Sequence, residues 1–464
     1  MNDVPVPDGR LRSALLRFGV GSRQLLLLTA ALIWSGVCIY VVSPKIVAFL
    51  LVGSVVTPGL WWAHRHGRLP RVVVSPSLAI LLAFGIYLVI NALWSADPSV
   101  AFWVVVRHFV FAVALCLTLQ LLEDGDPRFA ATMLRAFLFA YALMACIVLF
   151  EVATDMLLRR VMNTLLPFTQ IADKKVLTIE NGKVIAIADY LTNRNVAALC
   201  FLFWPALYAS RYIAGDQRSK MIRWLVLAIV VVAVARSNHA SSKAAMTTAA
   251  LVFALAYVSR VTAWRTIVAG WIVATMLVVP ISIAVKTWSG LEHSTLVYSF
   301  RHRVVIWGFT AVKVLEKPWL GVGVGSTRIL DETERPALGA TDDPAMPPST
   351  NVHAHNVYLQ AWFELGGVGA IFLLLSGLPL LAWMRRQSDD VFPYLAAAFA
   401  LGATMAAFSY SFTAPWFLAS FGFSAIFMRL AVEAGKPAVT ALLQQSVQQL
   451  ANDADADRTR DAAA

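Results

Sequence analysis

The polar residues best placed for chemistry lie in one short block just before a long apolar run. Residues 351–356 read NVHAHN. A neutral histidine can accept a proton near neutral pH, so His355 and His353 are candidates for a general base. Two histidines at this spacing do not share one face of a helix, and no HExxH motif or Cys/His set accompanies them. We therefore expect no metal site and no cofactor here, and Asn356 joins the histidines as a substrate-binding candidate.

Arginines stand close to the same kind of boundary between polar and apolar chain. Arg301 and Arg303 begin a basic segment upstream of the histidines, and Arg194 lies near the start of another apolar run, followed by Asn195. Arginine stays charged in a poor dielectric and binds phosphate with two parallel hydrogen bonds. Such cations beside a candidate base suit a lipid-linked diphosphate, because they would stabilise the charge that develops on a departing diphosphate.

Three of the cations also have a structural interpretation. Arg194 could reach the lipid headgroups or pair with Asp189, and Arg107, deep in its apolar run, could belong to a buried structural pair. Lys243 stands at a predicted helix start, where positive charge opposes the helix dipole, so a nearby anion would favour it there. An exposed lysine with no ligand is the alternative. Arg107 and Lys243 therefore remain secondary substrate-binding candidates.

The elements that position these residues must be membrane helices. Of the 464 residues 59% are hydrophobic and 14% charged, with mean hydropathy +0.69, whereas soluble chains carry about 25% charge. Runs of roughly 18 to 23 apolar residues are long enough to cross a hydrocarbon core. We predict twelve spans in an all-α polytopic protein: Leu25–Val42, Lys45–Trp62, Ser77–Trp94, Val100–Leu122, Phe129–Phe150, Tyr190–Tyr212, Met221–Ala235, Lys243–Ser259, Trp264–Val285, Asn356–Trp383, Val391–Phe408 and Ser411–Val432.

The net charge of +11 lies at helix ends, which indicates membrane topology and not a nucleic-acid partner. Basic residues concentrate in alternate short connections, so both termini are predicted to be cytoplasmic, in a bacterial inner membrane. The four cysteines fall inside predicted spans and are expected to be packing residues. The predicted divisions are a cytoplasmic N-terminus (1–24), nine spans (25–285), a lid loop (286–354), three spans (355–432) and a cytoplasmic tail (433–464).

Two long connections fall on the same, outer side. The first, at 151–189, contains Asn181-Gly182 between two β-branched runs, which predicts a β-hairpin. The second, at 286–354, contains an amphipathic helix over Phe300–Glu316, expected along the membrane surface. Its predicted apolar face consists of Phe300, Val304, Trp307, Val312 and Leu315. The helix continues into a turn with glycines at 321, 323 and 325 that lacks the lysine of a phosphate-binding loop.

These motifs resemble those of the O-antigen ligase family of membrane glycosyltransferases. His355-Asn356 followed by GGVG at 366–369 is similar to the family's His-Asn…Gly-x-x-Gly motif. The segment from Arg303 to Trp307 and the turn at 318–326 are similar to its Arg-x-x-x-Trp and Pro-x-x-Gly-x-Gly segments. A third match is Asn193-Arg194-Asn195, which opens the sixth predicted span. The chain departs from the family at Lys243, where relatives often carry arginine.

The resemblance implies a GT-C-like fold with a periplasmic lid loop, and transfer of O-antigen from undecaprenyl diphosphate to lipid A-core without a metal. It implies that His355 activates the acceptor hydroxyl and that Arg194 and Arg303 hold the diphosphate while the anomeric carbon inverts. The partners would be the lipid-linked glycan donor, the lipid A-core acceptor and membrane lipids.

Three alternatives stay open. A polysaccharide polymerase and a protein O-oligosaccharyltransferase would use the same donor with another acceptor. A polymerase more often has two sizeable basic outer loops, whereas the loop at 151–189 has no histidine and only scattered basic residues. A transporter of lipid-linked glycans would have ionisable residues near the bilayer midplane and discontinuous helices. The outward position of the polar residues favours an enzyme.

Overall fold

The computed structural model describes residues 22–42, 53, 59–63, 66, 73–123, 127–166, 177–213, 217–288, 298–334, 353–437 and 440–441. It is mostly helical and divides into two compact units. The first comprises Met1–Val73, Leu117–Lys243 and Ser420–Ala464, and the second comprises Val74–Cys116 and Ala244–Ala419. Three continuous helices contribute residues to both units: α5 (Pro98–Glu123), α10 (Ala240–Val258) and α17 (Pro415–Ala434).

In the first unit the long helix α6 (Pro127–Ala153) packs against three others, which are α2 (Ser22–Val42), α8 (Asn193–Ile213) and α9 (Gln217–Arg236). Large aromatic rings pack inside this unit. The Phe137 ring stacks on that of Phe427 with centroids 3.9 Å apart. Pro205 lies inside α8 and cannot donate to the carbonyl of Phe201, but the hydroxyl of Ser424 donates to it at 2.9 Å. The helix therefore continues through the proline.

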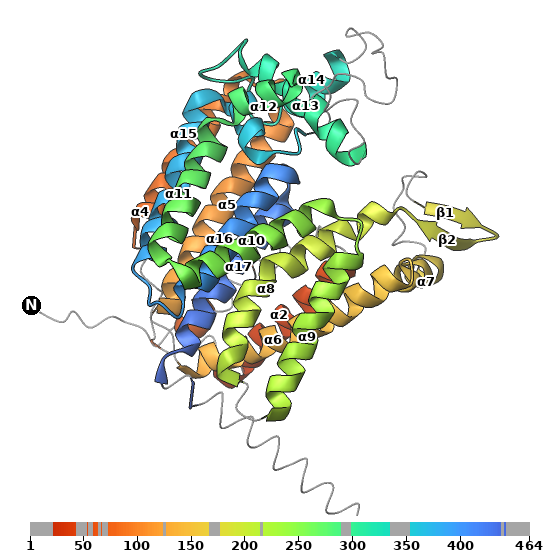
Figure 1. Cartoon of the computed structure of the whole chain (residues 1–464), viewed down its shortest axis with the longest axis vertical. Helices are drawn as coiled ribbons and strands as arrows, with labels where there is room; N and C mark the ends of the chain where they lie inside the picture. Colours follow the sequence, from red (N-terminus) through yellow and green to blue (C-terminus); the bar gives the residue numbers. More distant parts are fainter. Residues whose placement is uncertain are drawn as a thin grey trace, which may run out of the picture. The chain divides into compact units, whose positions relative to one another are not determined.

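The predicted hairpin is confirmed. Strands β1 (Leu177–Glu180) and β2 (Lys183–Ile187) pair antiparallel, and Asn181 and Gly182 form the turn with φ of 48° and 75°. Positive φ at both central residues is the geometry of the two-residue hairpin turn. The hairpin lies beside the short helix α7 (Leu157–Leu165), as Figure 1 shows, and the 3-10 turn η4 (Asp189–Leu191) leads from it into α8.

The second unit surrounds α15 (Val357–Arg385), which packs against α4, α11, α13 and α16. The bounds of its remaining helices are α4 (Pro76–Asn91), η2 (Ala92–Trp94), α11 (Arg260–Met276), α12 (Val278–Thr287), α13 (Tyr298–Val314), α14 (Thr327–Glu334) and α16 (Phe392–Phe408). Its core includes Leu88, Ala101, Val324 and Leu365.

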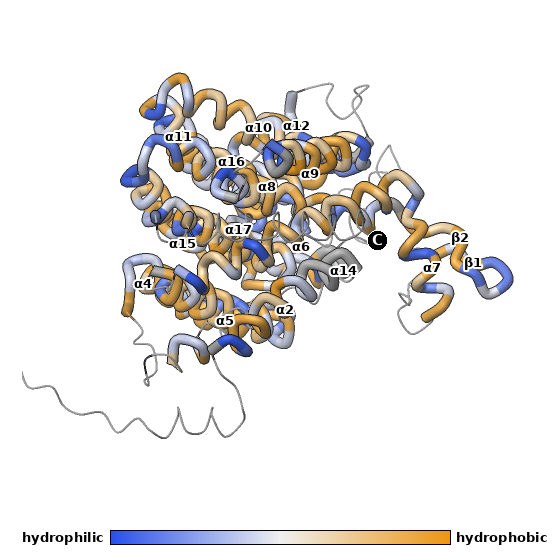
Figure 2. The backbone as a smooth tube through the Cα atoms, turned by 90° about the horizontal axis from the view of Figure 1, so that it is seen from below, coloured by the Kyte–Doolittle hydropathy of each residue, from blue (hydrophilic) through white to orange (hydrophobic). Residues whose placement is uncertain are grey.

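The protein is a polytopic membrane protein. Six described helices are long and apolar enough to cross a bilayer, or seven if α11 and α12 form one bent span. The six are Pro76–Trp94, Pro98–Leu122, Pro127–Ala153, Ala240–Val258, Val357–Arg385 and Pro415–Ala434, and apolar residues dominate them in Figure 2. Twelve spans remain a prediction, and most of the run at Lys45–Trp62 lies outside the described residues.

Two predicted spans are not continuous helices. The run Trp264–Val285 is divided into α11 and α12, which meet at Leu277 with a bend of 74°. Pro280 explains the break, since a proline cannot donate to the carbonyl four residues earlier and its ring clashes with it. The indole Nε1 of Trp362 donates to the carbonyl of Thr275, two residues before the bend, at 2.8 Å. The second break lies within Asn356–Trp383, where Gly366 has φ 66° and ψ −167° inside α15.

The predicted amphipathic helix forms as α13, but its buried face differs from the one expected. Val304, Trp307, Ala311 and Val314 are buried, whereas Val312 and Leu315, which we assigned to the apolar face, are about half exposed at 48% and 59%. Positions 304, 307, 311 and 314 are three or four residues apart, as one face of a helix requires. The expected set contains a five-residue step from Trp307 to Val312, which leaves that face.

Candidate functional site

His355 occupies an unusual backbone conformation that aims its ring at a neighbouring connection. Its φ is 51°, in the left-handed region where histidine is among the enriched non-glycine residues. Nδ1 lies 2.9 Å from the backbone carbonyl oxygen of Ser409, which follows α16. A carbonyl can only accept a hydrogen bond, so Nδ1 carries the proton. In a neutral imidazole the free lone pair then lies on Nε2, which can accept a proton.

Two further bonds hold the loop that carries this histidine. The Trp307 indole Nε1 in α13 donates to the carbonyl of Ala354 at 3.0 Å, between the two histidines. Asn356 is the N-cap of α15, because its side-chain oxygen accepts from the amide of Leu359 at 3.0 Å. The Asn356 of the His-Asn motif therefore has a structural task as well as its predicted role in substrate binding.

Positive groups lie around His355. The His353 ring centroid is 4.2 Å from that of His355. Burial first, and then the positive potential of His353, Arg303 and His302, lowers the pKa of His355 to about 3, and the bond with Ser409 opposes this only in part. Burial also lowers the pKa of Arg303, while Tyr410 raises it. The imidazole is thus neutral at pH 7, and the arginine remains charged because its ordinary pKa is above 12.

The break at Gly366 is closed by the glycine-rich turn at 318–326. The amides of Val322 and Gly323 donate to the carbonyls of Phe363 and Glu364, at 3.0 and 2.9 Å. The amides of Gly367 and Val368 donate to the carbonyls of the turn, at Pro318 and Trp319. Backbone groups at helix ends need such partners when they are buried. The two motifs that appeared separate in the sequence therefore form one interlocked structure.

A buried carboxylate and a buried amide fix this structure from the inside. Glu364 accepts from the amide of Gly325 at 2.8 Å, from Gln360 Nε2 at 3.0 Å, and from both the amide and the hydroxyl of Thr327. Asn91, at the end of α4, donates to the carbonyl of Leu320 at 2.9 Å and accepts from the amide of Val324 at 2.6 Å. Both residues were missed by the sequence analysis.

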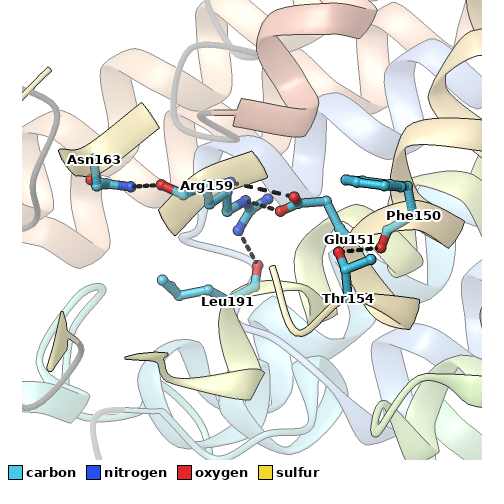
Figure 3. Close-up of polar contacts among 6 residues, drawn as sticks. All are labelled: Phe150, Glu151, Thr154, Arg159, Asn163 and Leu191. Atoms are coloured by element: carbon cyan, nitrogen blue, oxygen red, sulfur yellow. Dashed lines mark hydrogen bonds and ion pairs between the residues drawn. The ribbon is translucent and has the colours of Figure 1, made fainter. Parts of the chain in front are cut away.

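The first unit holds the Arg194 group. Arg194 and Asn195 begin α8, Asn195 is buried, and Arg194 is half-buried. Another arginine that we did not predict lies beside them: Arg159 of α7 forms an ion pair with Glu151 at 3.4 Å and donates to the carbonyl of Leu191 at 3.1 Å, as Figure 3 shows. Burial lowers the pKa of Arg159, the negative charge of Glu151 raises it, and the positive charge of Arg194 lowers it.

Lys243 and Arg107 are the secondary candidates. Lys243 is exposed near the start of α10, while the neighbouring His239 Nδ1 lies 2.6 Å from the hydroxyl of Ser242. Arg107 Nε donates at 2.8 Å to the carbonyl of Trp103 in its own helix. Within the part of the chain that the structure describes, no contact joins Arg107 to His355. Their roles in substrate binding stay predictions.

The structure therefore brings together one part of the predicted set. His353, His355, Asn356 and Arg303 belong to one group in the second unit, and Arg301 lies two residues before Arg303 in α13. Among the described residues, Arg301 Nε is buried without a hydrogen-bond partner. Arg194, Asn195 and Lys243 belong to the first unit. The carbonyls of Ser409 and Ala354 could not be found from sequence, because any residue type supplies a carbonyl.

Comparison with known proteins identifies the region that holds this group. Residues 224–374 match the family described as O-Antigen ligase. Three rickettsial proteins, each named "Putative polysaccharide ligase", are similar over shorter stretches. The Rickettsia conorii protein is 28% identical over 136 residues, which is 29% of this chain and 33% of the relative. The Rickettsia prowazekii protein is 25% identical over 188 residues, 40% and 45% of the two chains. The Rickettsia typhi protein is 36% identical over 78 residues, 17% and 19%. The similarity thus spans less than half the length of each relative.

Proposed function

We propose that this chain, whose residues 224–374 match the O-antigen ligase family, transfers a glycan from undecaprenyl diphosphate to lipid A-core. The single observation that carries this proposal is the bond from His355 Nδ1 to the carbonyl of Ser409. That bond leaves Nε2 as the proton-accepting atom of a neutral imidazole, with Arg303 close enough to act on its pKa.

In this proposal His355 Nε2 removes the proton from the acceptor hydroxyl as its oxygen attacks the anomeric carbon. The bond from that carbon to the diphosphate breaks with inversion, and Arg303 stabilises the charge on the leaving group. Arg301 and Arg194 are further diphosphate ligands, Arg194 on its motif alone. A bound diphosphate would offset the positive potential that now lowers the pKa of His355, so the imidazole becomes a stronger base once the donor is bound.

The reaction is proposed to take place on the periplasmic face of the inner membrane and to need no metal ion. The positive-inside pattern of the short connections supports the periplasmic assignment. The name shared by the three relatives supports a polysaccharide ligase. The loop at 151–189 also favours a ligase over a polymerase, because its basic residues Arg159 and Arg160 hold the loop together. These two arginines bond to Glu151, Leu191, Ile185 and Thr154.

A transporter is less well supported, although the breaks at Leu277 and Gly366 are the discontinuous helices that such a protein would have. The break at Gly366 is closed by the turn at 318–326. The family match, and not the continuity of the helices, now favours the enzyme.

The test uses the purified full chain in detergent with undecaprenyl diphosphate-linked glycan and lipid A-core, with and without EDTA, and scores the lipid product by gel shift. We expect product in both conditions, and none from His355→Ala or Arg303→Ala. Arg386→Ala is the matched control, because Arg386 lies just after α15 at the opposite end of that helix from His355. Longer donor-linked chains formed without lipid A-core would instead assign the protein to the polymerases. Product from His355→Ala would remove the general-base role.

A further inference from the structure

Helix α7 turns its apolar side chains away from the protein. Leu157, Leu158, Val161 and Leu165 are exposed, with Leu165 at 72%. They recur at the spacing of one helical face. Soluble proteins rarely expose a continuous apolar face on a helix, and such a face marks an interaction surface.

The polar side chains of the same helix point inward and are bonded. Arg159 contacts Glu151 and the carbonyl of Leu191, in the arrangement that Figure 3 shows. Arg160 donates to the carbonyls of Ile185 and Thr154, at 3.0 Å each. Thr164 accepts from the amide of Val184 in β2, whereas the bond from Asn163 to the carbonyl of Arg159 lies within α7 itself. Loose packing of α7 therefore does not explain the exposed leucines, because polar contacts fix the inward face of the helix.

The contact between Arg159 and Glu151 also fixes where α7 lies along the neighbouring span. Glu151 is two residues from the end of α6, a 27-residue helix that can cross a bilayer. A helix of that length extends about 40 Å, and a bilayer with its headgroups is about 40–45 Å thick. The end of α6 thus falls in the headgroup region. Phe150, exposed at 46%, continues the apolar surface of α6 up to this level.

We propose that α7 is an interfacial helix that lies in the plane of the membrane, with Leu157, Leu158, Val161 and Leu165 among the lipid acyl chains near the headgroups. The partner is the lipid bilayer, argued from the continuity with the exposed face of α6. Helices of this kind bury their apolar face by about 5–10 Å at the boundary between headgroups and acyl chains. The inward arginines then anchor the helix to the protein and not to the lipid.

The test measures the surroundings of single nitroxide labels on the full chain in lipid nanodiscs, after serine replaces the cysteines at 38, 116, 146 and 200. Labels at Val161→Cys and Leu165→Cys should collide often with oxygen and rarely with a water-soluble nickel chelate. A label at Asn181→Cys, at the exposed tip of the hairpin in the same loop, is the matched control and should show the reverse.

Nickel collisions at Leu165 equal to those at Asn181 would place α7 in water and overturn the proposal. Low collision rates with both reagents would mean that a protein surface covers the helix, which also overturns it. If the labels disturb the fold, the rate of modification of Val161→Cys and Asn181→Cys by a membrane-impermeant maleimide gives the same answer. Slow reaction is expected at 161 and fast reaction at 181. Neither readout depends on transferase activity.

Discussion

The Nδ1 atom of His355 lies 2.9 Å from the backbone carbonyl oxygen of Ser409. Because the carbonyl can only accept, this contact selects the tautomer and leaves Nε2 available. His355 comes just before α15 and Ser409 just after α16, so the contact ties together the ends of two helices that pack against each other. The orientation of the candidate base therefore depends on the packing of the helices and not on the histidine alone.

The pH dependence of transfer should reflect the positive surroundings of His355. Its pKa is lowered to about 3, so the imidazole of the free protein stays neutral at pH values well below the ordinary histidine pKa of about 6.5. We expect kcat/KM for the donor to stay flat from pH 7 to pH 5. A bound diphosphate offsets part of the positive potential and raises this pKa, so kcat should fall at a higher pH than kcat/KM does.

The measurement is a pair of pH profiles from full kinetic curves at each pH. His355→Gln serves as the control, because its residual rate should lack the acid limb. A kcat/KM that falls by half near pH 6.5 would show that the free histidine titrates normally and contradict the predicted environment.

Trp307 should matter through its indole N–H. Trp307→Phe keeps the aromatic packing against Phe300 and Phe408 but loses the bond to the carbonyl of Ala354. We expect a loss of about 1 kcal/mol in the free energy of unfolding, and a larger relative loss of kcat, because the loop between the histidines is released. Trp288→Phe is the control, since that side chain is 73% exposed. Equal effects of the two substitutions on kcat would argue against a role for the bond.

The sequence predicted the parts of this site that depend on residue type. The Asn181-Gly182 hairpin and the limits of most helices follow from local chemistry, and His355 and Arg303 from their charge and position. The contacts that orient them do not. Ser409 and Ala354 act through their carbonyls, and the match between the glycine turn and the break at Gly366 requires two segments that are distant in sequence. The bend at Leu277 could have been predicted from Pro280, because proline breaks the helical bonding pattern.

Asn91 should stabilise the glycine turn far more than its position at the end of α4 indicates. Its buried amide bonds to the backbone of Leu320 and Val324. Asn91→Ala leaves those groups without partners, at a cost of about 1–3 kcal/mol each when they are buried. Thermal unfolding in detergent should show a clear loss. Asn163→Ala is the matched control, because Asn163 donates to one carbonyl of its own helix. An unfolding temperature unchanged by Asn91→Ala would mean that water replaces the amide.

Gly366 should not tolerate any side chain. Its φ of 66° with ψ of −167° is a region that is essentially restricted to glycine, and a Cβ there would overlap the carbonyl of Trp319. Gly366→Ala should therefore lower the free energy of unfolding by more than about 2 kcal/mol. It should also separate the break in α15 from the turn that closes it. Gly270→Ala, inside α11 with open space at its Cβ, should instead raise stability by about 0.5–1 kcal/mol. Both variants can be compared by the temperature at which the detergent-solubilised protein loses its monodisperse elution peak. If Gly366→Ala elutes and transfers glycan like the parent, the helix break does not need this backbone conformation.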